Sequence, residues 1–125
     1  DMVMFGHLRY EAVDAQPATL SKKWHDIIRN DLGFKEAIIT DDMIMLQNSG
    51  DASYADPVKN AIAAIQAGND LLLYVLDHSG GKSVIEPSSL IDGVTAAVND
   101  GRIEKEILDT HVRKNLNLRQ QISQL

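Results

Sequence analysis

Two adjacent carboxylates, Asp41 and Asp42, follow directly after the short apolar run at residues 37–40. Buried strands that end in acidic residues are typical of α/β folds, in which ligands bind and chemistry occurs at the carboxyl ends of the strands. Side chains alternate along a strand, so Asp41 falls on the face of Ala37 and Ile39, and Asp42 on the opposite face. Only one of the two can point along the axis of such a fold, where it could act as a nucleophile or anchor a ligand. A helix cap or a solvated turn is the alternative interpretation of the pair.

A histidine, His7, follows the apolar run at residues 2–5. Alternation places it on one face with Val3 and Phe5, and we expect this face to be the inward one, so that His7 lines the site. No metal-binding spacing such as HxH or HExxH links the four histidines, and the sequence has no cysteine. The sequence therefore predicts neither a metal site nor a cofactor. The other histidines fall on predicted helices or in a loop: His25, His78 and His111.

A glycine-containing segment, Gly80–Ser83, resembles the end of a phosphate-binding P-loop. The full pattern requires a glycine at the position that Leu76 occupies, and Pro87 intervenes before the next predicted helix. We therefore interpret the segment as a flexible loop. His78 precedes it, in the loop that follows the third predicted strand, where contact with a substrate is possible in principle.

Composition excludes several classes of partner. The net charge of −6 argues against nucleic acid and against an anionic membrane surface. No apolar stretch approaches the roughly 20 residues that span a bilayer, and the first residues lack the basic region of a signal peptide. The lack of cysteine fits a reducing compartment without identifying one. Hydrophobic residues make up 44% of the chain, which is enough for a packed core.

Strands and helices alternate along the chain in the order βαβαβαα. Ser21 is a predicted N-cap with Gly33 beyond the same helix, and Asp56 with Pro57 predicts a second helix that ends at Gly68. Ser88 or Ser89 is expected to cap a third helix. Three long loops without regular structure are expected at 8–19, 47–55 and 77–87. The predicted strands are 2–5, 36–40 and 71–76, and the predicted helices are 21–32, 57–67, 88–99 and 104–121.

The predicted connections are asymmetric. Loops after the strands are long and loops before them are short, which is the pattern of a (β/α)8 barrel with its site at the carboxyl ends of the strands. Residues 71–76 are apolar on both faces, as in a strand buried within a parallel sheet. Three parallel strands alone would leave both sheet edges open. We therefore predict an α/β fold made of the C-terminal three βα units of a TIM-type barrel plus a final helix, as a fragment of a larger domain.

Several motifs in this order resemble the β-N-acetylhexosaminidases of glycoside hydrolase family 3, and the resemblance covers nearly the whole chain. Its most specific part is the Thr-Asp-Asp step after an apolar strand, at Thr40–Asp42. The motifs are Met2-Val3-Met4 with His7, Pro17-Ala18-Thr19-Leu20-Ser21, Leu32-Gly33-Phe34, Ile38-Ile39-Thr40-Asp41-Asp42-Met43 with Met45, Ala63–Leu73, Arg102-Ile103-Glu104 and Val112-Arg113-Lys114-Asn115.

The resemblance implies a retaining glycosidase that removes terminal β-linked N-acetylglucosamine, with peptidoglycan-derived fragments as substrates. It assigns the nucleophile to Asp41, the first acid of the Thr-Asp-Asp step, and leaves Asp42 to support the strand–loop junction. We expect His7, Asp42 and Met45 to lie at the substrate. The family's acid/base, a His paired with an Asp on an earlier glycine-rich loop, has no matching pattern in residues 1–125. This piece alone is therefore expected to be inactive, and to self-associate or to need the missing N-terminal half.

One local departure from the family pattern follows Met45, where relatives carry a small residue and a shorter connection than residues 46–50. Two other classes of protein compete with the glycosidase. A small flavodoxin-like binding domain would use the two acids as a phospho-acceptor or Mg²⁺ pocket, but it needs about five strands. A degenerate barrel that binds a sugar or a protein without catalysis is the other.

Overall fold

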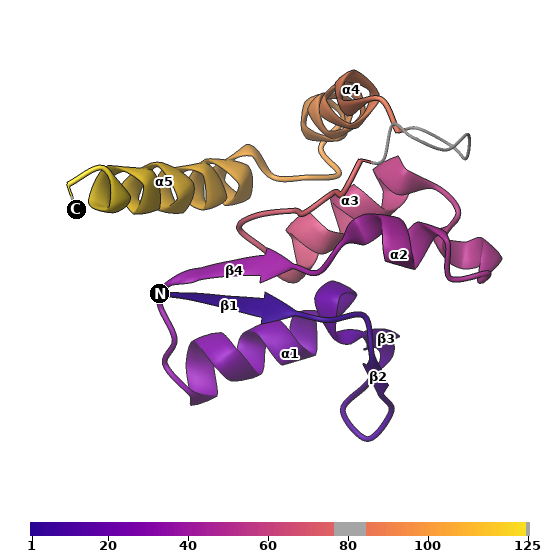
Figure 1. Ribbon diagram of the computed structural model, residues 1–125, viewed down its shortest axis with the longest axis horizontal. Coiled ribbons are helices and arrows are strands. Elements are labelled where there is room, and N and C mark those ends of the chain that lie inside the picture. The colour runs from indigo at the N-terminus through magenta and orange to yellow at the C-terminus, as the bar shows by residue number, and fades with distance from the viewer. Residues whose placement is uncertain (77–84, 125) are drawn as a thin grey trace.

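The computed structural model describes residues 1–76 and 85–124, so His78 and the Gly80–Ser83 segment lie outside the described residues. Figure 1 shows a two-stranded parallel ribbon, with α1 on one side of it and α2 and α3 on the other. The architecture is α/β, as the alternation of apolar runs predicts. None of the described helices is both long and apolar enough to cross a bilayer.

The centre of the fold is the parallel pair of β1 (Met2–Phe5) and β4 (Ala37–Thr40), both predicted correctly. The chain then passes along the other side of β4 through one parallel bridge, between Ile39 and Leu71. The predicted third strand at 71–76 is thus reduced to a single bridge. The amide of Leu73 donates to the side-chain Oγ1 of Thr40 at 2.9 Å instead of to a main-chain carbonyl, which ends the ladder. Val75 is 57% exposed, so this run is not buried on both faces.

The first helical segment lies against β1. Ser21 caps α1 (Lys22–Asp26) by accepting from the amide of Trp24, as predicted. The segment continues as a π-helix, η2 (Ile27–Asp31), and Gly33 follows with a positive φ of 67°. Leu32 continues the apolar stripe that Leu20, Trp24, Ile27 and Ile28 form at helical spacing, but it is 74% exposed. The wider π turn shifts the helical phase, which carries this position out of the stripe.

Two of the expected irregular loops contain regular structure. The first forms a small antiparallel hairpin, β2 (Arg9–Tyr10) and β3 (Asp14–Pro17), followed by the 3₁₀ turn η1 (Ala18–Leu20). The segment after β4 begins with α2 (Met43–Gln47) and continues to a second 3₁₀ turn, η3 (Ala52–Tyr54). Helices of five residues and hairpins of this size show no periodicity that a sequence pattern can detect.

The later helices follow their predicted positions. Asp56 accepts from the amides of Val58 and Lys59 at the start of α3 (Pro57–Ala67), and Gly68 ends this helix with φ 119°. The expected cap of α4 (Pro87–Asn99), Ser88 or Ser89, is wrong: Glu86 is the N-cap, because Pro87 takes the first helical position. α5 (Lys105–Ile122) closes the chain.

The buried core lies on both flanks of α3. One cluster joins α2 and η3 to α3, and the other joins α4 and the turn before α5 to α3; their buried members are Met43, Leu46, Tyr54 and Ala64, and Ile62, Ile65, Ala97 and Ile103. At Gly93, α3 and α4 approach so closely that an added Cβ would collide with Val58. Ile91, Val112 and Leu116 stand at apolar positions of the helical repeat in α4 and α5, from which the sequence predicts inward side chains, but they are 64%, 45% and 56% exposed.

A buried carboxylate, Asp70, holds the N-terminal end of β4. Its side chain is 0% exposed and accepts from the Ile38 amide at 2.9 Å, from Arg29 at 2.6 Å and from His111 Nδ1 at 2.7 Å. Lys114 lies 3.3 Å away. Burial opposes the ionisation of Asp70. The pKa of Asp70 is nevertheless lowered, because its carboxylate accepts hydrogen bonds from His111 and the Ile38 amide and lies near the charges of Lys114 and Arg29.

Candidate functional site

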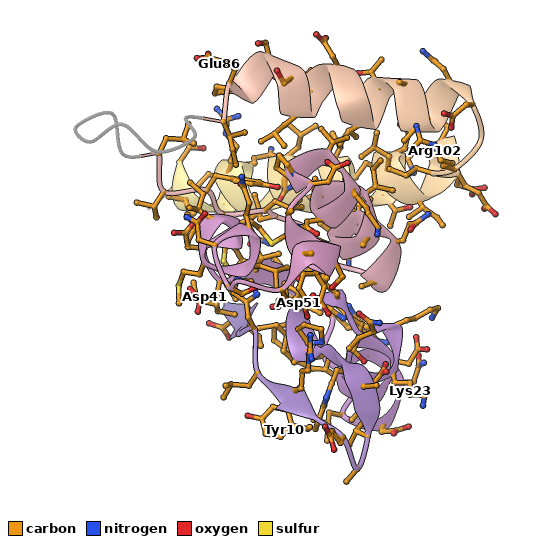
Figure 2. The ribbon with its side chains drawn as sticks, turned by 90° about the vertical axis from the view of Figure 1, so that its right-hand side faces the viewer. Tyr10, Lys23, Asp41, Asp51, Glu86 and Arg102 are labelled. Carbon is orange, nitrogen blue, oxygen red and sulfur yellow. The ribbon has the colours of Figure 1, made fainter. Side chains whose placement is uncertain are left out.

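Asp41 stands at the carboxyl end of β4 (Figure 2). Its amide continues the strand ladder by donating to the carbonyl of Phe5 at 2.9 Å. Its Oδ1 accepts from the Asp42 amide at 2.8 Å, and within residues 1–76 and 85–124 no donor contacts Oδ2. The carboxylate is half-buried. Asp41 is therefore held by its own turn while one oxygen remains open to a ligand.

The parallel register decides which face carries Asp41. Met2 pairs with Ala37 and Met4 with Ile39, so the face of Ile39 and Asp41 is that of the exposed Met4. The opposite face carries Phe5, whose ring lies 4.7 Å from the His25 ring of α1. Asp41 thus belongs to the face that α1 leaves uncovered, as alternation along the strand predicts.

His7 does not share that face. It follows Phe5 towards η1, where its Nδ1 lies 2.9 Å from the Thr19 hydroxyl and its Nε2 lies 2.9 Å from the Asp42 carbonyl. The residue links η1 to the main chain of the acidic turn, and its place at the substrate stays a prediction.

The partners of His7 favour one tautomer. The Asp42 carbonyl can only accept, so Nε2–H donates to it. The Thr19 hydroxyl lies 2.9 Å from Nδ1, and it also donates to the carbonyls of Gly6 and Phe5, at 2.7 and 3.0 Å. His7 therefore joins η1 to the peptide between Asp42 and Met43.

Asp42 supports the strand–loop junction, as predicted. Its Oδ1 accepts from the Ile44 amide at 3.1 Å, which caps α2, and from the Val75 amide at 3.0 Å. Burial, with the charge of Asp42, raises the pKa of the nearby Tyr74 to about 12, so this phenol stays neutral. Met45 projects from α2 with 58% of its side chain exposed.

A cavity of about 500 Å³ lies beside this turn, between the β2–β3 hairpin and the α2–η3 segment. It shares His7 and Met45 with the predicted site. Sequence reasoning did not detect the charged pair on its wall, Arg9 and Asp51, because 42 residues separate the two positions. The remaining lining residues are Leu8, Pro17, Leu46, Ser49 and Tyr54.

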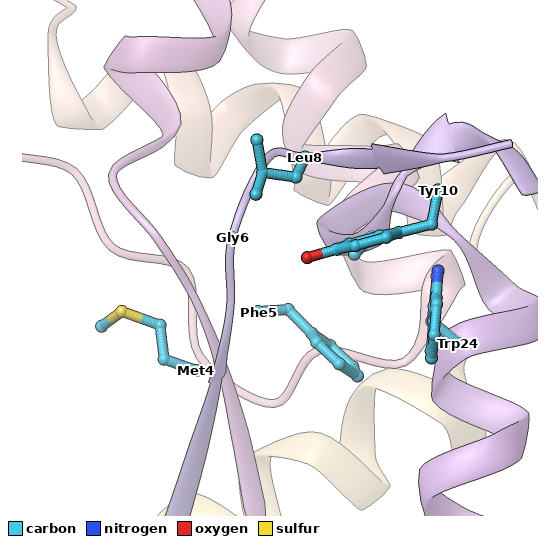
Figure 3. Close-up of a pocket in the computed structure, with 7 residues that line it drawn as sticks. Met4, Phe5, Gly6, Leu8, Tyr10 and Trp24 are labelled. Atoms are coloured by element: carbon cyan, nitrogen blue, oxygen red, sulfur yellow. The ribbon is translucent and has the colours of Figure 1, made fainter.

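A second cavity, of about 350 Å³, lies on the other side of the hairpin (Figure 3). Its walls are largely apolar. They are formed by Phe5, Leu8 and the rings of Tyr10 and Trp24, whose centres lie 5.5 Å apart. In the described part of the chain, no cluster of three or more His, Asp or Glu side chains is arranged to hold a metal ion.

Parallel strands flanked by helices, with a carboxylate at the carboxyl end of β4, are the arrangement of TIM-barrel-type α/β domains. The profile of the glycosyl hydrolase family 3 N terminal domain matches residues 1–118, and the chain belongs to this family. The family resemblance expected from the sequence motifs is thereby confirmed.

Curated relatives carry the description "Beta-hexosaminidase". One from Psychromonas ingrahamii is 40% identical over 87 residues, which is 69% of this chain and 25% of the relative. Another from Nitrosomonas eutropha is 32% identical over 103 residues, or 82% of this chain and 28% of the relative. The chain thus spans about a quarter of the length of these proteins.

Solved structures agree with the family fold. The β-N-acetylglucosaminidase from Thermotoga maritima superposes with a TM-score of 0.71 at 27% identity, covering 90% of this chain and 23% of that one. The β-N-acetylhexosaminidase from Beutenbergia cavernae gives a TM-score of 0.72 at 26% identity, covering 94% and 32%.

Proposed function

We propose that this chain is part of a β-N-acetylhexosaminidase that removes terminal β-linked N-acetylglucosamine. The observation that carries the proposal is the Asp41 carboxylate at the end of β4, with Oδ1 held by its own turn and no described donor on Oδ2. The names of the relatives in the same family support the reaction class. Peptidoglycan-derived fragments are the proposed natural substrates.

Asp41 is the proposed nucleophile. Its carboxylate attacks the anomeric carbon, the leaving oxygen takes a proton from an acid, and water then hydrolyses the covalent glycosyl–enzyme. Retention requires the acid/base about 5–5.5 Å from the nucleophile, so that both reach one anomeric centre. We propose that residues outside positions 1–125 supply it, because the family's His–Asp pattern is missing from this sequence.

His7, Asp42 and Met45 are proposed to serve substrate binding in different ways. His7 bonds to Thr19 and to the Asp42 carbonyl, and the Asp42 side chain accepts from the amides of Ile44 and Val75, so these two residues are proposed to position the nucleophile. Met45 has a largely exposed side chain on α2 and can contact the sugar directly.

The domain is proposed to be the C-terminal three βα units of a (β/α)8 barrel with a final helix. Two features support this. Within the described residues β1 pairs with β4 alone, and Met2 and Met4 on its open face are 43% and 53% exposed. In a complete barrel, another βα unit pairs with such an edge. The isolated chain is accordingly proposed to be inactive, and to self-associate through this edge or to require the missing half.

The test is to trap the intermediate in the complete protein that carries residues 1–125. A 5-fluoro derivative of N-acetylglucosaminyl fluoride should add one sugar mass, and peptide mapping should place it on Asp41. Asp41→Asn should abolish both labelling and hydrolysis of 4-nitrophenyl N-acetylglucosaminide. Asp42→Asn is the matched control, since asparagine also caps helices and should keep the turn.

A label on another residue would refute the nucleophile assignment. Sugar binding without labelling or turnover would instead favour the non-catalytic barrel module. Hydrolysis by residues 1–125 alone, lost on Asp41→Asn, would contradict the proposal that the acid/base comes from elsewhere.

A further inference from the structure

The cavity beside the acidic turn has a polar wall that is already ordered. Arg9 Nη2 donates to Asp51 Oδ2 at 2.9 Å and to the Tyr54 hydroxyl at 3.1 Å, and its guanidinium lies 5.5 Å from the centre of the Tyr54 ring. The other oxygen of Asp51 accepts from the amide and the hydroxyl of Ser53. Both members of the pair are therefore fixed from two sides.

The side chains of Arg9 and Asp51 in this wall stay charged although both are partly exposed to solvent. Hydrogen bonds from Ser53 and Arg9 lower the pKa of Asp51 to about 2, so it stays ionised at neutral pH. The side chains of Arg9 and Asp51 are 46% and 41% exposed. The pair has no net charge, and it offers unused guanidinium donors next to carboxylate oxygens. Such a surface suits a ligand with many hydroxyl groups better than it suits an anion or a cation.

Apolar side chains line the same cavity. Leu8 and Met45 are 67% and 58% exposed, although both are large hydrophobic residues. Pro17, the last residue of β3, lines the cavity as well. A pyranose ring has the matching chemistry, because it presents hydroxyl groups at its edge and C–H groups on its faces. The cavity volume of about 500 Å³ is in the range of small-ligand sites.

We propose that this cavity binds the second sugar ring of the substrate, with Arg9 and Asp51 holding its hydroxyl groups and Met45 and Leu8 packing on its face. The proposal rests on the proposed glycosidase function. His7 and Met45 line the cavity, and His7 also lies 2.9 Å from the Asp42 carbonyl, so a single side chain separates the cavity from the acidic turn.

Two substrates that differ in this ring test the proposal in the complete protein. N,N′-diacetylchitobiose has the second ring, and N-acetylglucosaminyl fluoride lacks it. For both substrates, kcat/KM depends on every step from the free enzyme to the cleavage of the bond at the anomeric carbon. Arg9→Ala should lower kcat/KM for the disaccharide about tenfold or more, as expected for a lost hydrogen bond to a charged group, and should leave that for the fluoride within about twofold.

Two further variants separate binding from a merely structural ion pair. Asp51→Asn can still accept from Ser53 and should show the same selective loss. Arg102→Ala removes a pair of similar exposure, with Asp100 at 2.7 Å, that lies away from this cavity, and it should change neither substrate.

Equal losses for both substrates, or no loss for the disaccharide, would overturn the second-ring assignment while leaving the glycosidase proposal intact. An unmodified protein that cleaves neither substrate would refute the glycosidase proposal, and the assignment with it.

Discussion

Replacing Asp70 with asparagine tests whether the buried carboxylate at the start of β4 stabilises the fold through its charge. Asparagine keeps the shape and can still accept from the Ile38 amide, which is 2.9 Å from Asp70. It cannot neutralise Arg29, His111 and Lys114, which approach the carboxylate at 2.6, 2.7 and 3.3 Å. The variant therefore isolates the ionic part of the network.

The expected cost follows from burial. Removing one partner of a fully buried ion pair costs about 3–5 kcal/mol. Asp70 is 0% exposed, but the side chains of Arg29, His111 and Lys114 are 20%, 13% and 31% exposed and can recover some hydration. We therefore expect the free energy of unfolding to fall by about 2–4 kcal/mol.

Urea denaturation followed by circular dichroism measures this change. With a slope of about 2 kcal/mol/M, the midpoint should fall by about 1–2 M while the slope stays constant. Asp26→Asn is the matched control, because it removes the exposed pair with Lys22, whose side chains are 70% and 49% exposed. That variant should change stability by less than about 0.5 kcal/mol.

The pH dependence supplies an independent signature. The pKa of Asp70 is lowered in the folded state, so its stabilisation is fully present above the unfolded value of about 3.9 and is lost as the pH falls through the folded value. The difference between the original protein and Asp70→Asn should therefore shrink below about pH 4. A difference no larger than that of Asp26→Asn, or one independent of pH, would refute the reasoning.

Two other changes test the packing and the turn. Gly93→Ala should destabilise the protein by about 1–3 kcal/mol in thermal unfolding, because the new methyl group collides with Val58, and the double variant with Val58→Ala should recover most of the loss. His7→Ala removes one of two donors to the Asp42 carbonyl, which keeps the Met45 amide at 3.0 Å, and should lower the free energy of unfolding by about 0.5–1.5 kcal/mol. His7→Gln, which can still donate, should lose less; equal losses would argue against the hydrogen bond as the cause.

Local chemistry made part of this fold predictable. The Asp56-Pro57 start and the Gly68 end of α3 depend on residues within one turn, and both appear in the structure as expected. The strands β1 and β4 are continuous apolar runs, which also show in the sequence. The third strand was overestimated, because its hydrophobicity says nothing of the Thr40 side chain that takes the Leu73 amide.

The candidate site, like the fold, was predictable only in part. The side of the sheet on which Asp41 lies follows from alternation, whereas the role of His7 depends on Thr19, which is 12 residues away, and on Asp42, which is 35 away. The Arg9–Asp51 pair is separated by 42 residues, and Asp70 lies 41 residues from both Arg29 and His111. Contacts of this kind form only once the chain has folded, so no local sequence pattern predicts them.

The two ends of β4 have different roles. At its start, the Ile38 amide is tied to Asp70 and through it to α5; at its end, Asp41 opens onto the loops. Substitutions in the hairpin or in the segment after α2 can therefore reshape what the protein binds without touching the ionic anchor. Substitutions beyond the carboxyl end of β4 can therefore change specificity and lower stability, while the ionic network at its start maintains the stability of the fold.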